Sequence, residues 1–511
     1  MSAPSEALYD ADAMRALDGW AVGEAGAEGM VLMESAGRQL ADAVDEAYPT
    51  GAVVVLCGGG NNGGDGYVAA RVLRDGGRAV HVVAVADPSS LRGDAATALQ
   101  RLSGDPPVPF AEETLSAGAV VIDALLGTGT TGAPRGAVAD VIACVNRSGL
   151  PVVAADVPSG VDASTGETPG PAIQAQLTVT FAAHKLGLWI APGKHHSGEI
   201  RVAQLPYPGR WPVAESGNLL GSDAVSVIGP RGAESTKFTS GHVLIVGGSS
   251  GLSGAPILAA GGAMRAGAGY VTMGVPSALA PAVDQHLVEA MPIPLPGPTD
   301  HHDPVNAEVL TKHLATRGGA LVLGPGLGTS DGARELVLSL VGVTAPLVLD
   351  ADGLNAVSGT IEVLASRAAP TVLTPHAGEL ARLLGVSSDE VSARRLHHAR
   401  MAAELSGAVV VLKGDDTIIA HPGAPEVAVS RGGAPGLATA GTGDVLAGVV
   451  GALLAAGHAP GEAAAAAVVL HTEAGRQAAA RIGCADGVIA SDVVRALPAA
   501  LAALRSSDVA R

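Results

Sequence analysis

The chain contains few aromatic residues and few cysteines. Of its 511 residues only 2% are aromatic, so alanine, valine and leucine must fill the cores, with helices packed closely on sheets. The three cysteines, Cys57, Cys144 and Cys484, are odd in number and far apart in the sequence. This excludes a disulfide framework and indicates a reducing compartment, so we expect a cytoplasmic protein.

Positive charge and long apolar runs are also scarce. The chain has 31 Lys and Arg residues against 49 Asp and Glu residues, for a net charge of −18. This balance argues against nucleic acid or an anionic membrane as the main partner. An anionic small molecule remains compatible, because backbone amides and helix N-termini bind phosphate without lysines. The apolar run Ala463–Leu470 is too short to span a bilayer, and Ser5–Trp20 lacks the apolar core of a signal peptide.

The length of the chain favours two domains, and short apolar runs recur in both halves. In the first half, helices are expected at 11–22 and 29–48, and buried strands at 52–57, 79–85, 119–123, 151–156 and 177–181. In the second half, strands are expected at 242–247, 269–275, 320–323, 346–349, 371–374 and 408–412. Helix-length spacers separate most of these runs, which predicts parallel sheets with helical crossovers. We expect domains at 1–215 and 222–511, a linker within 205–222, and a rigid surface loop at Pro292–Pro298.

The glycine-rich segment Gly58–Gly66 is the most informative part of the first half. It follows the apolar run Val53–Leu56 and precedes a helix that we expect to begin at Tyr67. Glycines let the backbone approach a bulky anion closely, and a following helix adds its positive N-terminal end. The spacing also satisfies the dinucleotide-binding fingerprint, which alone is a weak signal. The polar side chains of Asn61, Asn62 and Asp65 exceed that fingerprint and indicate a site with chemistry of its own or a bound ion.

Other polar side chains follow neighbouring strands of the first half. Asp123, Asp156 and Ser159 stand where two predicted strands end, and Lys185 follows a third. Ligands of open α/β sheets bind beyond the carboxyl ends of the strands, so we expect these residues to meet there. Each aspartate taken alone could instead cap a turn or helix, and Lys185 is either a surface lysine or a phosphate-binding or catalytic residue. The oxygens of Asn62, Asp123 and Ser159 suit a hard cation.

In the second half the most informative segment is Ala438–Gly448. Gly441 and Gly443 allow a tight turn, and Asp444 precedes an apolar helix. Such a helix N-terminus stabilises transferred phosphoryl charge, and Asp444 could accept a proton from an attacking hydroxyl. The alternative is a plain aspartate N-cap. Other glycine- or acid-rich segments accompany it at Gly247–Ser249, Ser253–Ala255, Gly324–Gly328, Asp350–Asn355, Thr374–Glu379 and Lys413–Thr417.

The motifs of the first half resemble the NAD(P)H-hydrate epimerase domain, the YjeF N-terminal family. The segments that carry the resemblance are Leu32–Gly37, Cys57–Gly66, Asp123–Gly129, Asp156–Gly160 and His184-Lys185. It implies potassium at Asn62, Asp123 and Ser159, and Asp156 and Lys185 become the catalytic candidates. It also implies that hydrated NAD(P)H, or NAD(P)HX, binds at Asn61, Asn62, Gly63, Gly64, Asp65, Gly127, Thr128, Gly129, Thr130, Thr131, Gly132, Ala133 and Asp156.

The motifs of the second half resemble the ribokinase-like fold, and specifically the ADP/ATP-dependent NAD(P)H-hydrate dehydratases. Gly441-Thr-Gly-Asp444 stands where sugar kinases more often carry Gly-Ala-Gly-Asp. By this resemblance, Ala255, Gly326, His376 and Asp444 contact the hydrate. The adenine nucleotide is expected at Lys413, Gly414, Asp415, Asp416, Thr417 and Gly443, with magnesium on its phosphates and Asp444 as the catalytic base.

Together the two resemblances imply a Rossmann-like domain followed by a ribokinase-like α/β domain, acting in the repair of nicotinamide cofactor. The first domain would interconvert the R and S hydrates, and the second would dehydrate the S form to NAD(P)H while ADP becomes AMP and phosphate. The partners are then small molecules, and we expect a homo-oligomer. Three alternatives remain open: a ribokinase-type small-molecule kinase, an NAD-dependent dehydrogenase with Asp87 as ribose ligand, and a non-catalytic metabolite sensor.

Overall fold

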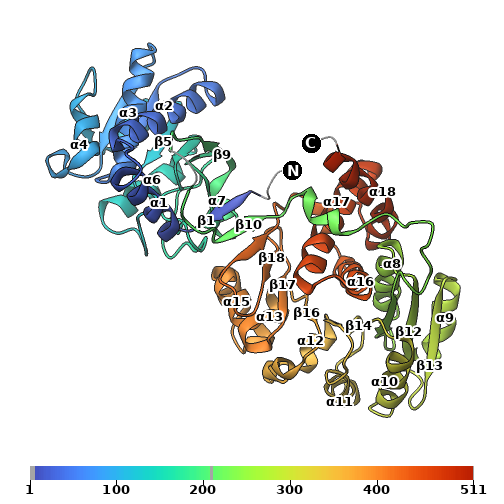
Figure 1. Ribbon diagram of the computed structural model, residues 1–511. Coiled ribbons are helices and arrows are strands. Elements are labelled where there is room, and N and C mark those ends of the chain that lie inside the picture. Colours follow the sequence, from blue (N-terminus) through green and yellow to red (C-terminus); the bar gives the residue numbers. More distant parts are fainter. Residues whose placement is uncertain (1–5, 208–210, 510–511) are drawn as a thin grey trace. The chain divides into compact units, whose positions relative to one another are not determined.

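The computed structural model describes residues 6–207 and 211–509, and the chain forms two compact units (Figure 1). Ala7–Gly217 is called here the N-terminal unit, and Asn218–Arg511 the C-terminal unit, to which Glu6 also belongs. Of the expected linker at 205–222, residues 208–210 lie outside the described residues. Its remainder contains the short strand β10 (Gly217–Leu219) and the start of η3 (Ser222–Val227).

The N-terminal unit is built on a seven-stranded parallel sheet in the order β4-β3-β2-β5-β6-β7-β9. Its strands are β2 (Val53–Cys57), β3 (Val80–Ala84), β4 (Val108–Pro109), β5 (Val120–Ala124), β6 (Val152–Ala155), β7 (Leu177–Phe181) and β9 (Glu199–Ala203). A separate parallel pair joins β1 (Ala7–Tyr9) and β8 (His184–Lys185). The five strands expected in this half are confirmed.

Helices cover both faces of this sheet. They are α1 (Ala11–Gly23), α2 (Gly29–Ala47), α3 (Asn61–Asp75), α4 (Gly93–Gln100), α5 (Glu112–Leu115), α6 (Ala137–Ser148) and α7 (Gly193–Ser197), with short 3₁₀ turns η1 (Pro88–Ser90) and η2 (Leu186–Leu188). Val53 and Val55 of β2 pack with α2, α3 and α4, whereas Val54 and Leu56 pack with α5 and α6. Strand β2 is thus buried on both faces, as its unbroken apolar sequence predicts.

The expected start of the helix after the glycine-rich segment is wrong. Helix α3 begins at Asn61, so Asn62 and Asp65 belong to its first turns rather than to a loop. The reason is close packing: a Cβ on Gly63 would lie 2.1 Å from the carbonyl oxygen of Gly58, and one on Gly64 2.6 Å from the Met33 side chain. These glycines serve the packing of α3 more than the flexibility of a turn.

The C-terminal unit contains a mixed sheet in the order β13-β12-β11-β14-β15-β16-β17-β18-β19-β10. Its strands are β11 (His242–Val246), β12 (Tyr270–Pro276), β13 (Ala290–Leu295), β14 (Ala320–Leu323), β15 (Leu347–Leu349), β16 (Thr371–Leu373), β17 (Val409–Leu412), β18 (Ile418–Ala420) and β19 (Val427–Val429). The strands from β13 to β17 pair in parallel, whereas β18 pairs antiparallel with both β17 and β19. The six strands expected here are confirmed, and with them the α/β fold class.

One expectation for this half is wrong. The proline-rich segment 292–298 is not a loop throughout, because its first residues belong to β13, the edge strand beside β12. An edge strand leaves one row of amide positions without a partner strand, so it tolerates prolines that a central strand would exclude.

The helices that pack over one face of this sheet include α8 (Gly254–Arg265), α16 (Thr442–Ala455), α17 (Pro460–Ile482) and α18 (Ala490–Val509). The others are α9 (Ala280–His286), α10 (Asn306–Arg317), α11 (Asp331–Leu340), α12 (Asp352–Ala356), α13 (Ala377–Leu384), α14 (Ser388–Ala393) and α15 (Arg395–Ser406), with 3₁₀ turns η4 (Ser277–Leu279), η5 (Ile361–Ser366) and η6 (Pro435–Leu437). A Cβ on Gly448 would lie 1.9 Å from the carbonyl oxygen of Ala259, so only glycine lets α16 approach α8 this closely. Small residues thus replace aromatics in the core.

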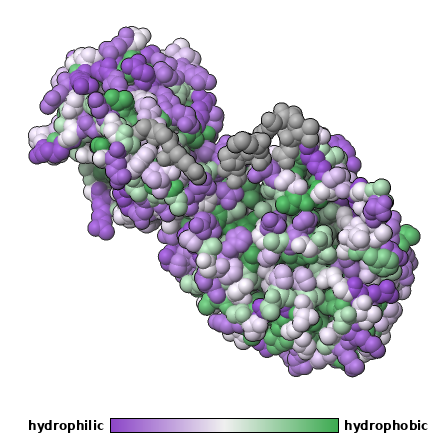
Figure 2. Space-filling view, in the orientation of Figure 1, coloured by the Kyte–Doolittle hydropathy of each residue, from purple (hydrophilic) through white to green (hydrophobic). Residues whose placement is uncertain are grey.

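The viewed surface mixes hydrophilic and apolar residues in both units, with green apolar residues more frequent on the C-terminal unit (Figure 2). Within residues 6–207 and 211–509, no helix combines the length and apolar character needed to cross a bilayer.

Candidate functional site

A cavity of about 730 Å³ opens in the N-terminal unit, where strands β2, β5 and β6 end. It collects nine of the residues predicted from sequence: Asn61, Asn62, Asp65, Gly127, Thr128, Gly129, Thr130, Asp156 and Lys185. Gly63 and Gly64 instead pack α3 against its neighbours. Gly132 lines a small adjoining hollow together with Gly127 and Thr130, and Ala133 lies against Gly170. The parallel sheet thus brings strand-end residues from distant parts of the sequence to one cavity, as expected for this fold class.

Asp156 is held by several groups at the cavity wall. Its Oδ1 lies 2.6 Å from Lys185 Nζ and accepts from the Phe181 amide at 3.3 Å, while Oδ2 accepts from the amide and hydroxyl of Thr128. Although burial alone would raise its pKa, the Lys185 ammonium and these hydrogen bonds hold the pKa of Asp156 below its ordinary value. The carboxylate is therefore ionised at neutral pH.

The backbone at Asp156 is strained, with φ at 67°. Among the described non-glycine residues, positive φ occurs only at Asp156, Ala182 and Ala351. Ala182 precedes the strand that carries Lys185, and Ala351 lies between two carboxylates of the second site. Strain of this kind persists only where the surrounding structure enforces it, and it gathers at functional sites.

Asn62, Asp123 and Ser159 form a buried oxygen cluster at the edge of the same cavity. Ser159 donates to Asp123 through its amide (2.8 Å) and its hydroxyl (2.6 Å), and Asn62 Nδ2 donates to the Leu126 carbonyl at 2.8 Å. Asn62 Oδ1 is buried without a hydrogen-bond partner, and Asp123 is fully buried, which raises its pKa to about 6. An orphaned amide oxygen beside a buried carboxylate fits a monovalent cation that binds through oxygen.

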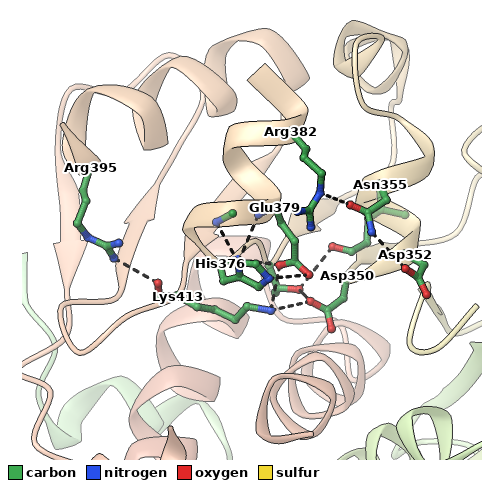
Figure 3. A network of polar contacts seen from close by, with 11 residues as sticks. Asp350, Asp352, Asn355, His376, Glu379, Arg382, Arg395 and Lys413 are labelled. Atoms are coloured by element: carbon green, nitrogen blue, oxygen red, sulfur yellow. Dashed lines mark hydrogen bonds and ion pairs between the residues drawn. The ribbon is translucent and has the colours of Figure 1, made fainter. Parts of the chain in front are cut away.

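A second polar cluster lies in the C-terminal unit, at the ends of β15, β16 and β17 (Figure 3). Lys413 Nζ lies 2.9 Å from Asp350 Oδ1 and 3.6 Å from Glu379 Oε2. Thr374 donates to Asp350 at 2.8 Å, and Glu379 accepts from the His376 amide at 2.8 Å. Opposite charges at these distances raise the pKa of Lys413 although burial opposes the shift.

Asp444 faces this cluster from the first turn of α16. Gly441 occupies the N-cap position with φ at 91°, and Asp444 lies inside the first turn of the helix, so the plain N-cap alternative is wrong. Burial, then the negative charge of Asp350, raises the pKa of Asp444 to about 7, while Lys413 opposes the shift. A Cβ on Gly443 would lie 3.2 Å from Lys413 Nζ, which places the lysine beside the helix N-terminus. A carboxyl with a pKa near neutrality can accept a proton there.

The segment Lys413–Thr417 forms a braced loop. Asp416 is buried and accepts from Arg395 Nε at 2.8 Å, Asp415 accepts from the Gly433 amide at 2.8 Å, and Thr417 donates to the Gly414 carbonyl at 2.7 Å. The side chains of these residues therefore hold the loop in shape.

Two other predicted hydrate contacts meet at the start of α8. A Cβ on Gly326 would lie 3.1 Å from the Ala255 Cβ, so the two residues are neighbours. His376, the third of these predicted hydrate contacts, caps α13 by accepting hydrogen bonds from the amides of Gly378 and Glu379.

Sequence reasoning missed several groups in both sites. Asp350 and Glu379 stand in segments that were singled out, but only the fold shows that they share one lysine. Asp18 and Tyr207 line the N-terminal cavity, yet neither stands in a glycine-rich segment, so no local signal could have found them. Asp87, the candidate ribose ligand of the dehydrogenase alternative, caps the turn η1 instead.

The fold and the two sites define a two-unit α/β protein with a ligand-sized cavity in one unit and a buried charged cluster beside a helix N-terminus in the other. Residues 29–187 match the model of the YjeF-related protein N-terminus, and residues 243–499 match that of NAD(P)H-hydrate dehydratase. The bifunctional NAD(P)H-hydrate repair enzyme of Moorella thermoacetica is 38% identical over 96% of both chains. That of Salinibacter ruber is 39% identical over 97% of both.

The chain belongs to the family of bifunctional NAD(P)H-hydrate repair enzymes. A solved structure of ADP/ATP-dependent NAD(P)H-hydrate dehydratase from Bacillus subtilis, co-crystallised with ATP and Mg²⁺, is similar to 56% of this chain. It is 27% identical with a TM-score of 0.47, and 98% of that chain is covered. The two full-length relatives and the two family models confirm the family predicted from the motifs.

Proposed function

We propose that the chain repairs hydrated nicotinamide cofactor in two steps, one in each unit. The N-terminal unit, for which 1–215 is the predicted domain, interconverts the R and S hydrates of NAD(P)H. The C-terminal unit, for which 222–511 is the predicted domain, dehydrates the S hydrate at the expense of ADP. The observation that carries this proposal is the pair of carboxylates with opposite pKa shifts: Asp156, lowered by Lys185, and Asp444, raised to about 7.

In the N-terminal unit, Asp156 is the ionised group beside the nicotinamide ring. Inversion at C6 requires the hydroxyl to leave and return, or the ring to open and close. When the hydroxyl leaves, positive charge develops on the ring. A fixed carboxylate stabilises such a cation more than it stabilises the neutral hydrate, and this difference accelerates the reaction. Lys185 keeps Asp156 ionised, and Asn62, Asp123 and Ser159 hold potassium, whose charge fixes the adjoining loops in place.

In the C-terminal unit, hydroxide is a poor leaving group, and phosphorylation of the C6 hydroxyl removes this barrier. Asp444 accepts the hydroxyl proton as the oxygen attacks the terminal phosphate of the nucleotide, and the first-turn amides of α16 stabilise the transferred charge. Phosphate then leaves with help from the ring nitrogen, and loss of a proton from C5 to solvent restores the double bond of NAD(P)H. Lys413, Gly414, Asp415, Asp416, Thr417 and Gly443 surround the nucleotide, and Ala255, Gly326 and His376 the hydrate.

Magnesium fits the donors of this unit. Asp350, Asp352 and Glu379 all raise the pKa of Asp444, so negative charge is concentrated where the nucleotide phosphates would bind. No cluster of three or more His, Cys, Asp or Glu residues in the described parts of the chain is placed to hold a metal alone. Magnesium commonly binds through one or two carboxylates and substrate phosphates, which matches this set. When bound, it neutralises the charge of the phosphoryl group.

The test is to incubate the full chain with an R/S hydrate mixture, potassium, magnesium and either ADP or ATP, and to follow the absorbance of regenerated NAD(P)H. The intact chain should consume both epimers. Asp156→Ala should lower the R-to-S rate at least roughly 10²-fold while S hydrate is still dehydrated. Asp444→Asn should abolish dehydration and leave epimerisation intact. Asp284 is an exposed carboxyl, and the Asp284→Asn variant is the matched control.

A stable phosphorylated product would favour the rival proposal, a small-molecule kinase fused to a dinucleotide-binding domain. We further propose a cytoplasmic homo-oligomer. The three cysteines are all free in the structure, which supports the reducing compartment.

A further inference from the structure

A carboxyl–phenol pair lines the N-terminal cavity on a wall that the proposed mechanism does not use. Asp18 projects from α1, and the Tyr207 hydroxyl, from the segment after β9, donates a hydrogen bond to it. Both residues line the same cavity as Asp156 and Lys185. Two of the carboxyl groups that line the cavity are therefore supported by different elements, Asp156 at the sheet edge and Asp18 on a covering helix.

Aromatic residues fix Tyr207 in place. Its ring packs edge-on against Trp211 with centroids 5.6 Å apart, and Trp211 packs against Tyr9 at 5.7 Å. With Trp20 these residues form one cluster behind Asp18. In a chain with only 2% aromatic residues, four of them, Tyr207 included, gather in this cluster.

The chemistry of epimerisation requires proton exchange on two faces of the ring. The hydroxyl on C6 leaves as water from one face, which needs a proton donor there. Water then adds to the other face of the ring cation, which needs a proton acceptor. A single fixed carboxyl lies on only one side of a planar ring, so Asp156 alone cannot serve both.

The charged groups around Asp18 suit the role of proton donor, with Asp156 as the proton acceptor. It faces Tyr207, Lys185 and Asp156, and Asp65, Arg15 and Asp94 line the same cavity. Partial desolvation on the cavity wall raises the pKa of Asp18, Asp156 adds to this, and Tyr207 and Lys185 oppose it. The pKa of Asp156 is shifted in the opposite direction. Two carboxyls with pKa values pushed apart in one site divide into an acid and a base.

Solvent reaches Asp18 in the free protein, whereas Asp156 is buried. A bound nicotinamide ring displaces that solvent and raises the pKa of Asp18 further, because desolvation disfavours the charged carboxylate. Between turnovers, contact with water lets Asp18 regain its proton.

We propose that Asp18, oriented by Tyr207, is the second acid–base residue of the epimerase and exchanges protons on the ring face turned away from Asp156. The protonated Asp18 gives its proton to the C6 hydroxyl, the C6–O bond breaks with its electron pair on oxygen, and the N1 lone pair forms the C=N bond. Water adds to C6 from the other face through an oxygen electron pair that forms the new C–O bond. The C=N electron pair returns to N1, and the proton of the added water passes to Asp156. Solvent returns the proton from Asp156 to Asp18, and the opposite direction runs these steps in reverse. The inference rests on the proposed epimerase function.

The experiment measures the pH profile of kcat for R-to-S conversion in the full chain. Magnesium and ADP are saturating, so the chain's own dehydration removes S hydrate as it forms and epimerisation limits the overall rate. In the wild type, activity should fall at high pH as Asp18 loses its proton. Asp18→Asn should lower kcat roughly 10²-fold, the low end for acid–base catalysis, and remove this high-pH fall.

Tyr207→Phe removes the hydrogen bond that lowers the pKa of Asp18, so the high-pH fall should move to higher pH with a smaller loss of kcat. A purely structural role would not produce this displacement. Asp42→Asn, an exposed carboxyl on α2, is the matched control and should leave the profile unchanged. Dehydration of pure S hydrate should be unaffected in all variants, and thermal unfolding reports on the folding of the N-terminal unit.

A high-pH fall that persists in Asp18→Asn would overturn the proposal and assign the acid to another group, such as Asp65. An unmoved fall in Tyr207→Phe would also overturn it. Absence of epimerisation in the wild type would instead refute the proposed function, so the two failures are distinguishable.

Discussion

Lys185 Nζ lies 2.6 Å from Asp156 Oδ1, and both side chains are almost fully buried. The two residues come from strands β8 and the end of β6, and Thr128 from a third segment completes the group. Removing one member of a buried ion pair is costly, because it leaves an unpaired charge in a poorly solvated site. The pair therefore couples the stability of the N-terminal unit to its chemistry.

Lys185→Met should raise the pKa of Asp156, because it removes the charge that lowers it. Asp156 must be ionised to act, so the low-pH fall of epimerisation should move to higher pH. In the wild type, the folded-state pKa of Asp156 lies below its unfolded value of about 4. The ionised carboxylate therefore stabilises the fold above that pH, and this stability is lost as the pH falls through the folded-state pKa. The pH profile of R-to-S conversion and thermal unfolding measure both effects. Arg101 is an exposed cation of the same unit, and Arg101→Met should change neither the pH profile nor the thermal unfolding. If the low-pH fall of epimerisation stays at the same pH in Lys185→Met, Lys185 does not control the ionisation of Asp156.

Asp444→Asn should lower the turnover of dehydration by roughly 10²–10⁴, the range for the loss of a general base. In the wild type, kcat/KM for S hydrate should rise with pH through about 7, because Asp444 acts only when deprotonated. This rise should be absent in the variant, while ADP binding measured by calorimetry stays the same. Near-normal rates in Asp444→Asn would remove this residue from the catalytic role.

Lys413→Met should weaken ADP binding at least roughly 10-fold, because it removes the cation beside the N-terminus of α16. A hydrogen bond between this lysine and a nucleotide phosphate would contribute about 1.5–3 kcal/mol. The same change should move the pH dependence of dehydration upward from about 7, because Lys413 lowers the pKa of Asp444. Calorimetry and the pH profile measure the two effects. Lys312→Met, an exposed lysine on α10, is the control, and equal ADP affinity in both variants would refute the assignment.

Potassium should stabilise the N-terminal unit through Asn62, Asp123 and Ser159. A ligand at about 100 times its Kd stabilises the folded state by about 2.7 kcal/mol. Thermal unfolding in potassium chloride, compared with choline chloride at equal ionic strength, should show a higher Tm. Asp123→Asn should abolish the difference, and the exposed control Asp42→Asn should retain it. The same Tm in both salts for the wild type would argue against the cation site.

Much of this protein could be predicted from local sequence. The unbroken apolar runs such as Val53–Cys57 identify strands buried on both faces, and the spacing between them identifies parallel α/β units. Asp156 and Asp444 could be singled out because each follows a strand or glycine turn where ligands of this fold class bind. The proline-rich segment 292–298 misled the prediction, because a run of prolines does not reveal that its strand lies at a sheet edge.

The sequence by itself determined the strands, the glycine turns and the family, since these depend on residues close together in the chain. Only the tertiary structure decided which charges meet. Lys413 joins Asp350 and Glu379 across three strands, and Asp18 meets Tyr207 across most of the N-terminal unit. The pKa shifts arise from burial and from these long-range contacts, and neither is encoded in the neighbours of a residue along the chain.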